Sequence, residues 1–338
     1  MFRLSFKATK NYIKNFLILK SGKPIENLEP LVFSYYITMN CNFNCSYCSF
    51  AKSGIIRKPD NRLNTNDVFK LLKIIRQETA YIYFTGGEPL IRNDFCDILK
   101  ECKRLNFKAI SVNTNMSLIH DKMEILNYTT NLVASLDMLD KKAYSKVLGV
   151  PVEIVEKVKQ NIITCSKLQK GKNFTMTINS VVTKETIEDT RQVMDFCLQN
   201  NIRFAVVPAE FDNGEINTDL QNNKEYLKLI KDIIKKKKVN KLIFGSKKYF
   251  ETILDFKKFD CYPNLIPHVY PNGDLLYPCE PLQSNTVNLL KAGSYKKAFT
   301  ECVRKYGKLP NCKNKCHKAC YIEPTNIIKN PLLIREII

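Results

Sequence analysis

Short apolar runs alternate along the chain with longer stretches in which apolar residues recur every three or four positions. The runs are typical of buried strands, and the stretches are typical of helices with one apolar face. Strands are predicted at 31–38, 80–84, 108–112, 131–136, 174–182 and 203–207, and helices at 65–78, 94–105, 118–126, 152–168 and 187–200. Six strand–helix units predict a parallel sheet with helices outside it. Because a full barrel needs eight units, the predicted fold is α/β, a partial (β/α)6 TIM-like barrel.

Three further regions flank this barrel, which is assigned to 31–215. The N-terminal region, 1–30, carries a basic amphipathic helix at 6–20, which either packs on its own domain or lies on a membrane surface. A helical connector is predicted at 216–260, with helices at 218–238 and 249–256. The last region, 261–338, is a small cysteine-rich extension with a hairpin at the Pro-Asn-Gly-Asp turn of 271–274.

The composition of the chain bears on its cellular compartment and on the partners that its charge could attract. The 338 residues include 13 cysteines, and the first 20 residues contain neither a secretory apolar segment nor a membrane span. A cytoplasmic location is therefore predicted, where thiols stay reduced and serve metal binding or burial. The net charge of +20 attracts anions, but the lysines are spread out, which favours an ordinary Lys-rich surface. Nucleic acid is not expected as a partner, and peripheral membrane contact stays open.

Cys41, Cys45 and Cys48 follow the first strand on one loop. Structural zinc sites want four protein ligands, usually as two separated pairs, whereas a 4Fe-4S cluster normally takes four cysteines. Three thiolates on one loop therefore suggest a cluster with one open iron, where a small molecule can bind. A structural zinc half-site is the alternative.

This segment resembles the radical S-adenosylmethionine (SAM) enzymes. The resemblance implies that Cys41, Cys45 and Cys48 hold a catalytic 4Fe-4S cluster whose open iron binds SAM. The family usually carries an aromatic residue before the third cysteine, and Tyr47 stands there as a cofactor-binding candidate. Reductive cleavage of SAM would yield a 5′-deoxyadenosyl radical, with an electron donor such as flavodoxin or ferredoxin.

Residues at the carboxyl ends of the other strands extend the resemblance. The sequence Thr-Gly-Gly-Glu-Pro at 85–89 is similar to the family motif that grips the amino group of SAM, which implicates Gly86, Gly87 and Glu88. The resemblance further assigns polar contacts with SAM to Asn113, Ser135 and Asp137, and an apolar backing for the adenine to the segment at 207–208. Helix capping is the alternative for Asn113.

The C-terminal cysteines call for a second explanation. The extension resembles the auxiliary-cluster regions called SPASM and twitch domains, and a single second iron–sulfur cluster fits its spacing best. The ligand candidates are Cys261, Cys279, Cys312, Cys316 and Cys320. The last three are expected on one side of a short helix, which would turn His317 away, and Cys302 is treated as spare. A four-cysteine zinc site is the alternative. Four cysteines within predicted helices are expected to be buried apolar residues, namely Cys96, Cys102, Cys165 and Cys197.

The predicted function is a radical SAM enzyme that modifies an organic substrate, namely a peptide, a protein or a natural-product precursor. A membrane isoprenoid or lipid is the alternative substrate, because of the basic N-terminal helix and a loose similarity to the adenosylhopane-forming enzyme. An alternative from a different functional class is a zinc-binding protein that binds nucleic acid. That alternative gives no role to the Gly-Gly-Glu-Pro turn.

Overall fold

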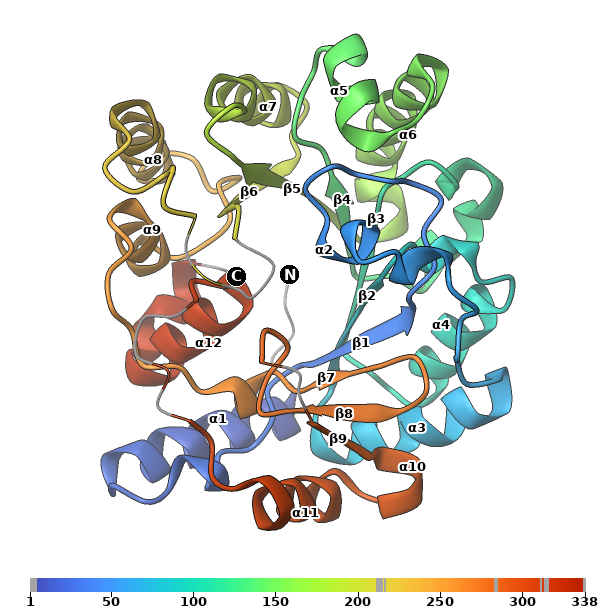
Figure 1. Ribbon diagram of the computed structural model, residues 1–338, viewed down its shortest axis with the longest axis vertical. Coiled ribbons are helices and arrows are strands. Elements are labelled where there is room, and N and C mark those ends of the chain that lie inside the picture. The colour runs from blue at the N-terminus through green and yellow to red at the C-terminus, as the bar shows by residue number, and fades with distance from the viewer. Residues whose placement is uncertain are drawn as a thin grey trace.

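A computed structural model of the chain describes residues 5–210, 215, 217–282, 285–310, 312 and 316–336. One curved sheet of nine strands organises the molecule, in the order β6-β5-β4-β3-β2-β1-β7-β8-β9 (Figure 1). The first six strands are parallel and stand in sequence order: β1 Phe33–Thr38, β2 Tyr81–Gly86, β3 Ala109–Thr114, β4 Asn131–Ser135, β5 Thr175–Val182 and β6 Arg203–Pro208. The sheet is not closed, so the prediction of a partial barrel is confirmed.

The C-terminal region adds three strands to the free edge of β1. Strand β7 (His268–Val269) pairs with β1 in parallel, and β8 (Asp274–Tyr277) and β9 (Asn285–Asn288) follow as an antiparallel meander. The hairpin predicted around the turn at 271–274 is therefore confirmed. One continuous sheet runs through the predicted barrel and the cysteine-rich extension.

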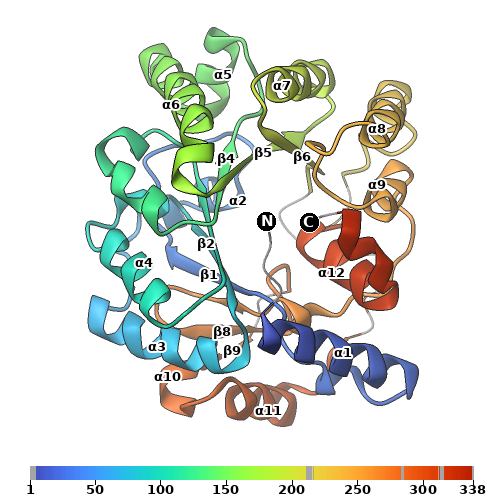
Figure 2. The same cartoon turned by 180° about the vertical axis from the view of Figure 1, so that it is seen from behind.

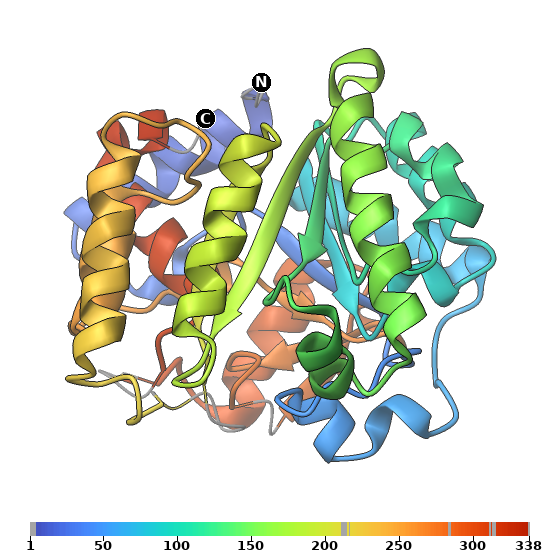
Figure 3. The same ribbon diagram turned by 90° about the horizontal axis from the view of Figure 1, so that it is seen from above.

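The helices α3, α4, α6 and α7 lie outside the curved sheet, on its convex face, whereas α2 lies at the carboxyl ends of the strands (Figures 1 and 3). The helices of the described residues are α1 Phe6–Lys20, α2 Ser49–Lys52, α3 Thr65–Glu78, α4 Phe95–Arg104, α5 Lys141–Leu148, α6 Val152–Lys172, α7 Ile187–Gln199, α8 Lys224–Lys237, α9 Lys247–Leu254, α10 Leu289–Ala292, α11 Tyr295–Tyr306 and α12 Ala319–Lys329. The helix predicted at 118–126 is instead a kinked 3-10 segment, Ile119–Asn127. The main core lies between the helices and the sheet, and alternate strand residues such as Tyr36, Tyr83 and Asn113 face the concave side.

The basic N-terminal helix α1 packs beside α12, as Figure 2 shows. The Tyr12 hydroxyl donates a hydrogen bond to the Ile327 carbonyl, and Ile18 packs with Ile328. None of the described helices is long and apolar enough to cross a membrane. Helix α12 begins only at Ala319, so the prediction that Cys312, Cys316 and Cys320 share a helix is wrong: Cys316 instead forms a β-bridge with Glu215.

Candidate radical SAM site at the carboxyl edge of the sheet

The loop with Cys41, Cys45 and Cys48 leaves the end of β1 at the carboxyl edge of the sheet, beside α5 (Figure 3). All three thiols are free and partly buried. Burial raises the pKa of Cys41 to about 11 and that of Cys45 to about 12, and the neighbouring thiols add to the shift. Cys41 and Cys45 therefore hold their protons in the metal-free chain, and a bound cluster would have to displace these protons.

The two glycines at the end of β2 make room for this loop. A Cβ atom on Gly86 would lie 2.1 Å from the Thr38 carbonyl oxygen, and one on Gly87 would lie 2.0 Å from the Asn40 carbonyl oxygen. Gly86 also has a φ of +128°, which favours glycine. The Gly87 and Glu88 amides donate to the carbonyls of Thr38 and Asn40 over 2.9 and 2.8 Å. The observed close approach is thus between two chain segments, and it fixes where the cysteine loop begins.

Glu88 is fully buried and braces the neighbouring turn. Its carboxylate accepts hydrogen bonds from the Leu90 amide at 2.9 Å, the Thr114 hydroxyl at 2.8 Å and the Asn115 amide at 2.7 Å. Burial raises its pKa to about 7 although these donors lower it. Its contact with the amino group of SAM remains a prediction.

Asn113 and Ser135 face the concave side at the ends of β3 and β4. The Asn113 amide nitrogen lies 3.5 Å from the Thr85 hydroxyl, while its Oδ1 atom is buried without a hydrogen-bond partner among the described residues. A buried acceptor without a partner is costly, so this atom fits a ligand that donates a hydrogen bond. The contact with SAM predicted for Asn113 is consistent with this geometry.

Tyr47 and Asp137, both predicted to bind SAM, contact each other. The Tyr47 hydroxyl donates to Asp137 Oδ2 over 2.6 Å. Asp137 lies two residues beyond β4 and is buried, which raises its pKa to about 6. At the other end of the loop, Asn42 donates to the Ser117 hydroxyl and accepts from the Asn115 amide group.

Helix α5, which the sequence prediction missed, supports the same loop. The Asn44 and Ser46 amides donate to the carbonyls of Leu148 and Val147, at 3.0 and 2.9 Å. Two cap signals mark this helix in the sequence. Asp140 accepts from the Ala143 amide at its N-terminus, and Gly149, at φ +65°, ends it.

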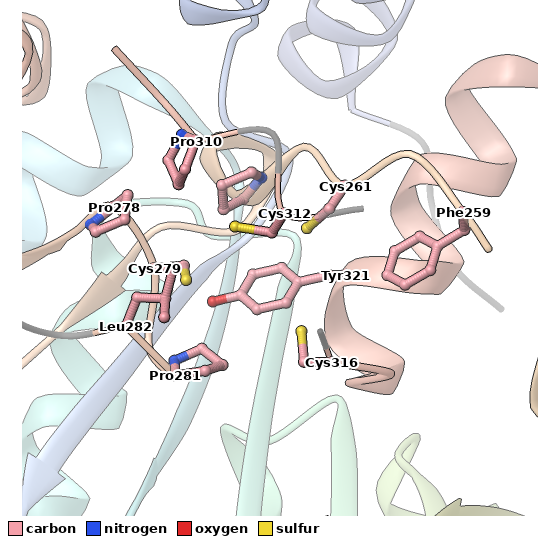
Figure 4. A pocket seen from close by; sticks show the side chains of 11 residues that line it. Phe259, Cys261, Pro278, Cys279, Pro281, Leu282, Pro310, Cys312, Cys316 and Tyr321 are labelled. Carbon is pink, nitrogen blue, oxygen red and sulfur yellow. The ribbon is translucent and has the colours of Figure 1, made fainter. Parts of the chain in front are cut away.

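The second group of cysteines lines a pocket beside α12 (Figure 4). Cys261, Cys279, Cys312 and Cys316 surround the ring of Tyr321, and their sulfurs come from separate segments of the chain. Apolar side chains complete the lining, among them Phe259, Pro278 and Leu282. Cys320 does not line this pocket. Its thiol nevertheless interacts electrostatically with Cys261 and Cys316, as well as with Tyr36 and Tyr83 on the concave face of the sheet.

A buried ion cluster lies next to this pocket. Lys318 Nζ is 2.8 Å from Glu280 Oε2 and 3.4 Å from Glu210 Oε2. Sequence spacing gives no signal for it, because Glu210 follows β6 while the other two flank C-terminal cysteines. His317 is buried, with its Nε2 atom 2.9 Å from the Lys257 carbonyl. Of the cysteines in predicted helices, Cys102, Cys165 and Cys197 are fully buried as expected, and Cys96 is partly buried.

Among the described residues, no three His, Cys, Asp or Glu side chains lie close enough to share one metal ion. A sequence profile described as the Radical SAM superfamily matches residues 35–197, which contain the cysteine loop and the Gly-Gly-Glu-Pro turn. Residues 35–197 therefore form a radical SAM domain. The protein is an enzyme, and its cofactors are a 4Fe-4S cluster and SAM.

Two relatives match nearly their whole length. A protein of Methanococcus aeolicus named Probable GTP 3′,8-cyclase is 27% identical over 303 residues, covering 83% of this chain and 97% of that protein. A protein of the same name from Methanocaldococcus jannaschii is 25% identical over 303 residues, with coverages of 85% and 96%.

Solved structures share the fold. Streptococcus suis SuiB bound to S-adenosylmethionine aligns with a TM-score of 0.60 and 24% identity, over 78% of this chain and 64% of SuiB. The structure of anSMEcpe with bound AdoMet aligns with a TM-score of 0.61 and 16% identity, over 90% of this chain and 96% of that chain.

The residues of this radical SAM enzyme fit its cofactors by their chemistry. Three reduced thiols stand on one loop, and Asn113 Oδ1, a buried acceptor with no hydrogen-bond partner in the part of the chain that the structure describes, faces the same edge. The individual assignments of Tyr47, Gly86, Gly87, Glu88, Ser135 and Asp137 to SAM remain predictions.

Proposed function

We propose that this radical SAM enzyme holds its catalytic cluster with Cys41, Cys45 and Cys48 and acts on a purine nucleotide, with GTP as the first substrate to test. The observation that carries the substrate is the similarity to the two archaeal proteins named Probable GTP 3′,8-cyclase, which covers 97% and 96% of their lengths. When bound, the cluster and SAM supply one-electron cleavage of the sulfonium and a 5′-deoxyadenosyl radical.

Side chains near the loop suit a nucleotide. Arg57 and Lys58 are exposed in the segment after the cysteine loop, where they can meet phosphates. Tyr36 lies on the concave face in edge contact with Phe50 and Tyr270, at ring-centroid distances of 5.9 and 5.8 Å, and aromatic faces of this kind stack on purines. The carboxylates of Glu210 and Glu280 can accept the N–H groups of guanine.

We further propose a second iron–sulfur cluster in the C-terminal pocket. Cys261, Cys279, Cys312 and Cys316 supply four thiols around one space, which matches the four cysteines that a cluster takes (Figure 4). Cys320 is the fifth candidate: it does not line the pocket, although its thiol interacts electrostatically with Cys261 and Cys316. A flavodoxin or ferredoxin is proposed as the electron donor of the catalytic cluster.

The test is anaerobic incubation of the reconstituted protein with reductant, SAM and one nucleotide at a time. GTP deuterated on its ribose should raise the yield of 5′-deoxyadenosine above the yield without nucleotide, and deuterium should appear in that product. ATP is the matched control and should give background. Deoxyadenosine that GTP does not stimulate would overturn the substrate proposal and leave the radical SAM assignment standing.

Peptide and lipid substrates, both predicted from the sequence, are further arms of this test. One observation supports a lipid substrate: helix α1 exposes the apolar side chains of Phe6, Ile13 and Leu17 (88%, 53% and 58%) among its lysines. Flotation with anionic phospholipid vesicles tests whether α1 binds a membrane. A wild-type chain that floats with the vesicles, together with a Phe6→Asp/Leu17→Asp variant that does not, would favour a lipid substrate over GTP.

A further inference from the structure

The buried carboxylate of Asp137 joins three elements. Its Oδ2 atom accepts hydrogen bonds from the Tyr47 hydroxyl at 2.6 Å and the Tyr144 hydroxyl at 3.4 Å. Its Oδ1 atom accepts from the Val181 amide at 2.8 Å, while its own amide donates to the Tyr144 oxygen at 3.2 Å. The cysteine loop, α5 and β5 are thus connected through one side chain that is 2% exposed.

Tyr47 makes this connection important for the cluster, because it stands between Cys45 and Cys48. A short hydrogen bond from a hydroxyl to a carboxylate is among the stronger kinds in proteins. Asn42, near Cys41, is a second side chain of the loop that makes hydrogen bonds outside it, to Asn115 and Ser117. Side-chain hydrogen bonds therefore hold both halves of the loop, and Phe43 packs in the core between them.

We propose that Asp137 is a positioning residue that holds the second half of the cysteine loop in place through Tyr47, and that its negative charge lies beside the cluster site. This inference rests on the proposed function only in taking Cys45 and Cys48 as ligands. The carboxylate accepts the hydrogen bond of Tyr47, which stands between Cys45 and Cys48 in the loop, so its charge lies near these two thiols. A negative charge next to an iron–sulfur cluster opposes the addition of an electron, so it lowers the reduction potential.

The first measurement uses the reduced, cluster-free chain. Alkylation of each cysteine by iodoacetamide is followed by mass spectrometry in the wild type, Tyr47→Phe and Asp137→Asn. Losing a hydrogen bond to a charged group should make Cys45 and Cys48 react about tenfold faster, whereas Cys41, next to the intact Asn42 link, should change less. The fully buried Cys102 and Cys165 serve as internal references for global unfolding.

Tyr144→Phe is the matched control, because it removes a phenol from the same carboxylate without touching the loop. It should label Cys45 and Cys48 at the wild-type rate. Wild-type rates in Tyr47→Phe, or equal acceleration in Tyr144→Phe, would overturn the inference. Tyr47→Phe keeps the test valid even where Asp137→Asn fails to fold, since it leaves the buried carboxylate in place.

The second measurement separates charge from hydrogen bonding. In the reconstituted protein, a redox titration followed by electron paramagnetic resonance should show a higher midpoint potential for Asp137→Asn and a wild-type potential for Tyr47→Phe. An unshifted potential in Asp137→Asn would remove the electrostatic half of the inference. Wild-type protein that forms no 5′-deoxyadenosine would instead refute the proposed function, so the two failures are distinguishable.

Discussion

The two cysteine sites of this enzyme are assembled in opposite ways. Cys41, Cys45 and Cys48 lie within eight residues on one loop, and contacts from the ends of β2, β3 and β4 and from α5 fix that loop. The C-terminal pocket gathers Cys261, Cys279, Cys312 and Cys316 from segments up to 55 residues apart. The first site is thus a local motif on a loop that neighbouring elements hold in place, whereas the second site depends on long-range folding.

This difference predicts different responses to loss of metal. The cysteine loop keeps its hydrogen bonds to Leu148, Val147 and Asp137 without iron, since protein groups supply them. The C-terminal thiols around Tyr321 have mainly apolar neighbours. The proposed iron–sulfur cluster would therefore contribute much of what holds these thiols together. We therefore expect a chelator to increase hydrogen exchange around Cys312 and Cys316 more than around Cys45.

The largest expected effect is on catalysis. In the Cys41→Ala/Cys45→Ala/Cys48→Ala variant, 5′-deoxyadenosine should fall to background, because no ligand remains for the catalytic cluster. Iron should fall from about eight to about four per chain, since the proposed C-terminal cluster would take its ligands from other cysteines. Iron and deoxyadenosine are measured after anaerobic reconstitution. A variant that loses all its iron would show that the two sites do not assemble separately.

A second prediction concerns the support rather than the ligands. Gly87→Ala should displace the cysteine loop, because the new Cβ would lie 2.0 Å from the Asn40 carbonyl oxygen, and the strain should cost about 1–3 kcal/mol or more in unfolding free energy. Gly171→Ala is the control: nothing lies within 4 Å of its Cβ position in α6, so stability should rise by up to about 1 kcal/mol. Denaturant unfolding gives both values. Equal stability in the two variants would contradict the tight approach of residues 87 and 40.

A third prediction sharpens the ligand set of the pocket. Cys279→Ala should lose about four irons while Cys320→Ala keeps them, since Cys320 does not line the pocket. The control is Cys302→Ala, because Cys302 is fully buried in the core away from the pocket and should leave iron unchanged. Iron loss in Cys320→Ala with retention in Cys316→Ala would exchange the two assignments.

The sequence predicts the local features of this molecule well. Six parallel strands in sequence order, the hairpin at 271–274 and the cysteine loop all depend on neighbouring residues or on simple alternation, and the structure contains them. The attachment of β7 to β1 was not predicted, because a two-residue strand leaves no periodic signal. The predicted shared helix for Cys312, Cys316 and Cys320 is wrong because equal spacing of cysteines does not by itself indicate a helix.

The site shows the same limit. Residue types marked Gly86, Gly87 and Asp137 as important, but only the fold shows that the glycines face the backbone of residues 38 and 40 and that Asp137 bonds Tyr47. The ion cluster of Glu210, Glu280 and Lys318 joins segments up to 108 residues apart, so no sequence motif predicts it. Pairings between distant side chains are set by topology, and a single sequence does not reveal them.

The smallest expected effect is a pH dependence of stability in the C-terminal region. Glu323 in α12 accepts hydrogen bonds from the amide and hydroxyl of Ser246, and burial raises its pKa from 4.5 to about 7. The folded chain then binds more protons at Glu323 than the unfolded chain between these values, so its contribution to the unfolding free energy falls as pH rises from 4.5 to 7. Because the side chain is partly exposed, the change should be about 1–2 kcal/mol.

Urea unfolding of the wild type and of Glu323→Gln at pH 5 and pH 7.5 measures this change in unfolding free energy. The difference between the two proteins should favour the wild type at pH 5 and shrink or reverse at pH 7.5, and a pH-independent difference would show that Glu323 stays ionised in the fold.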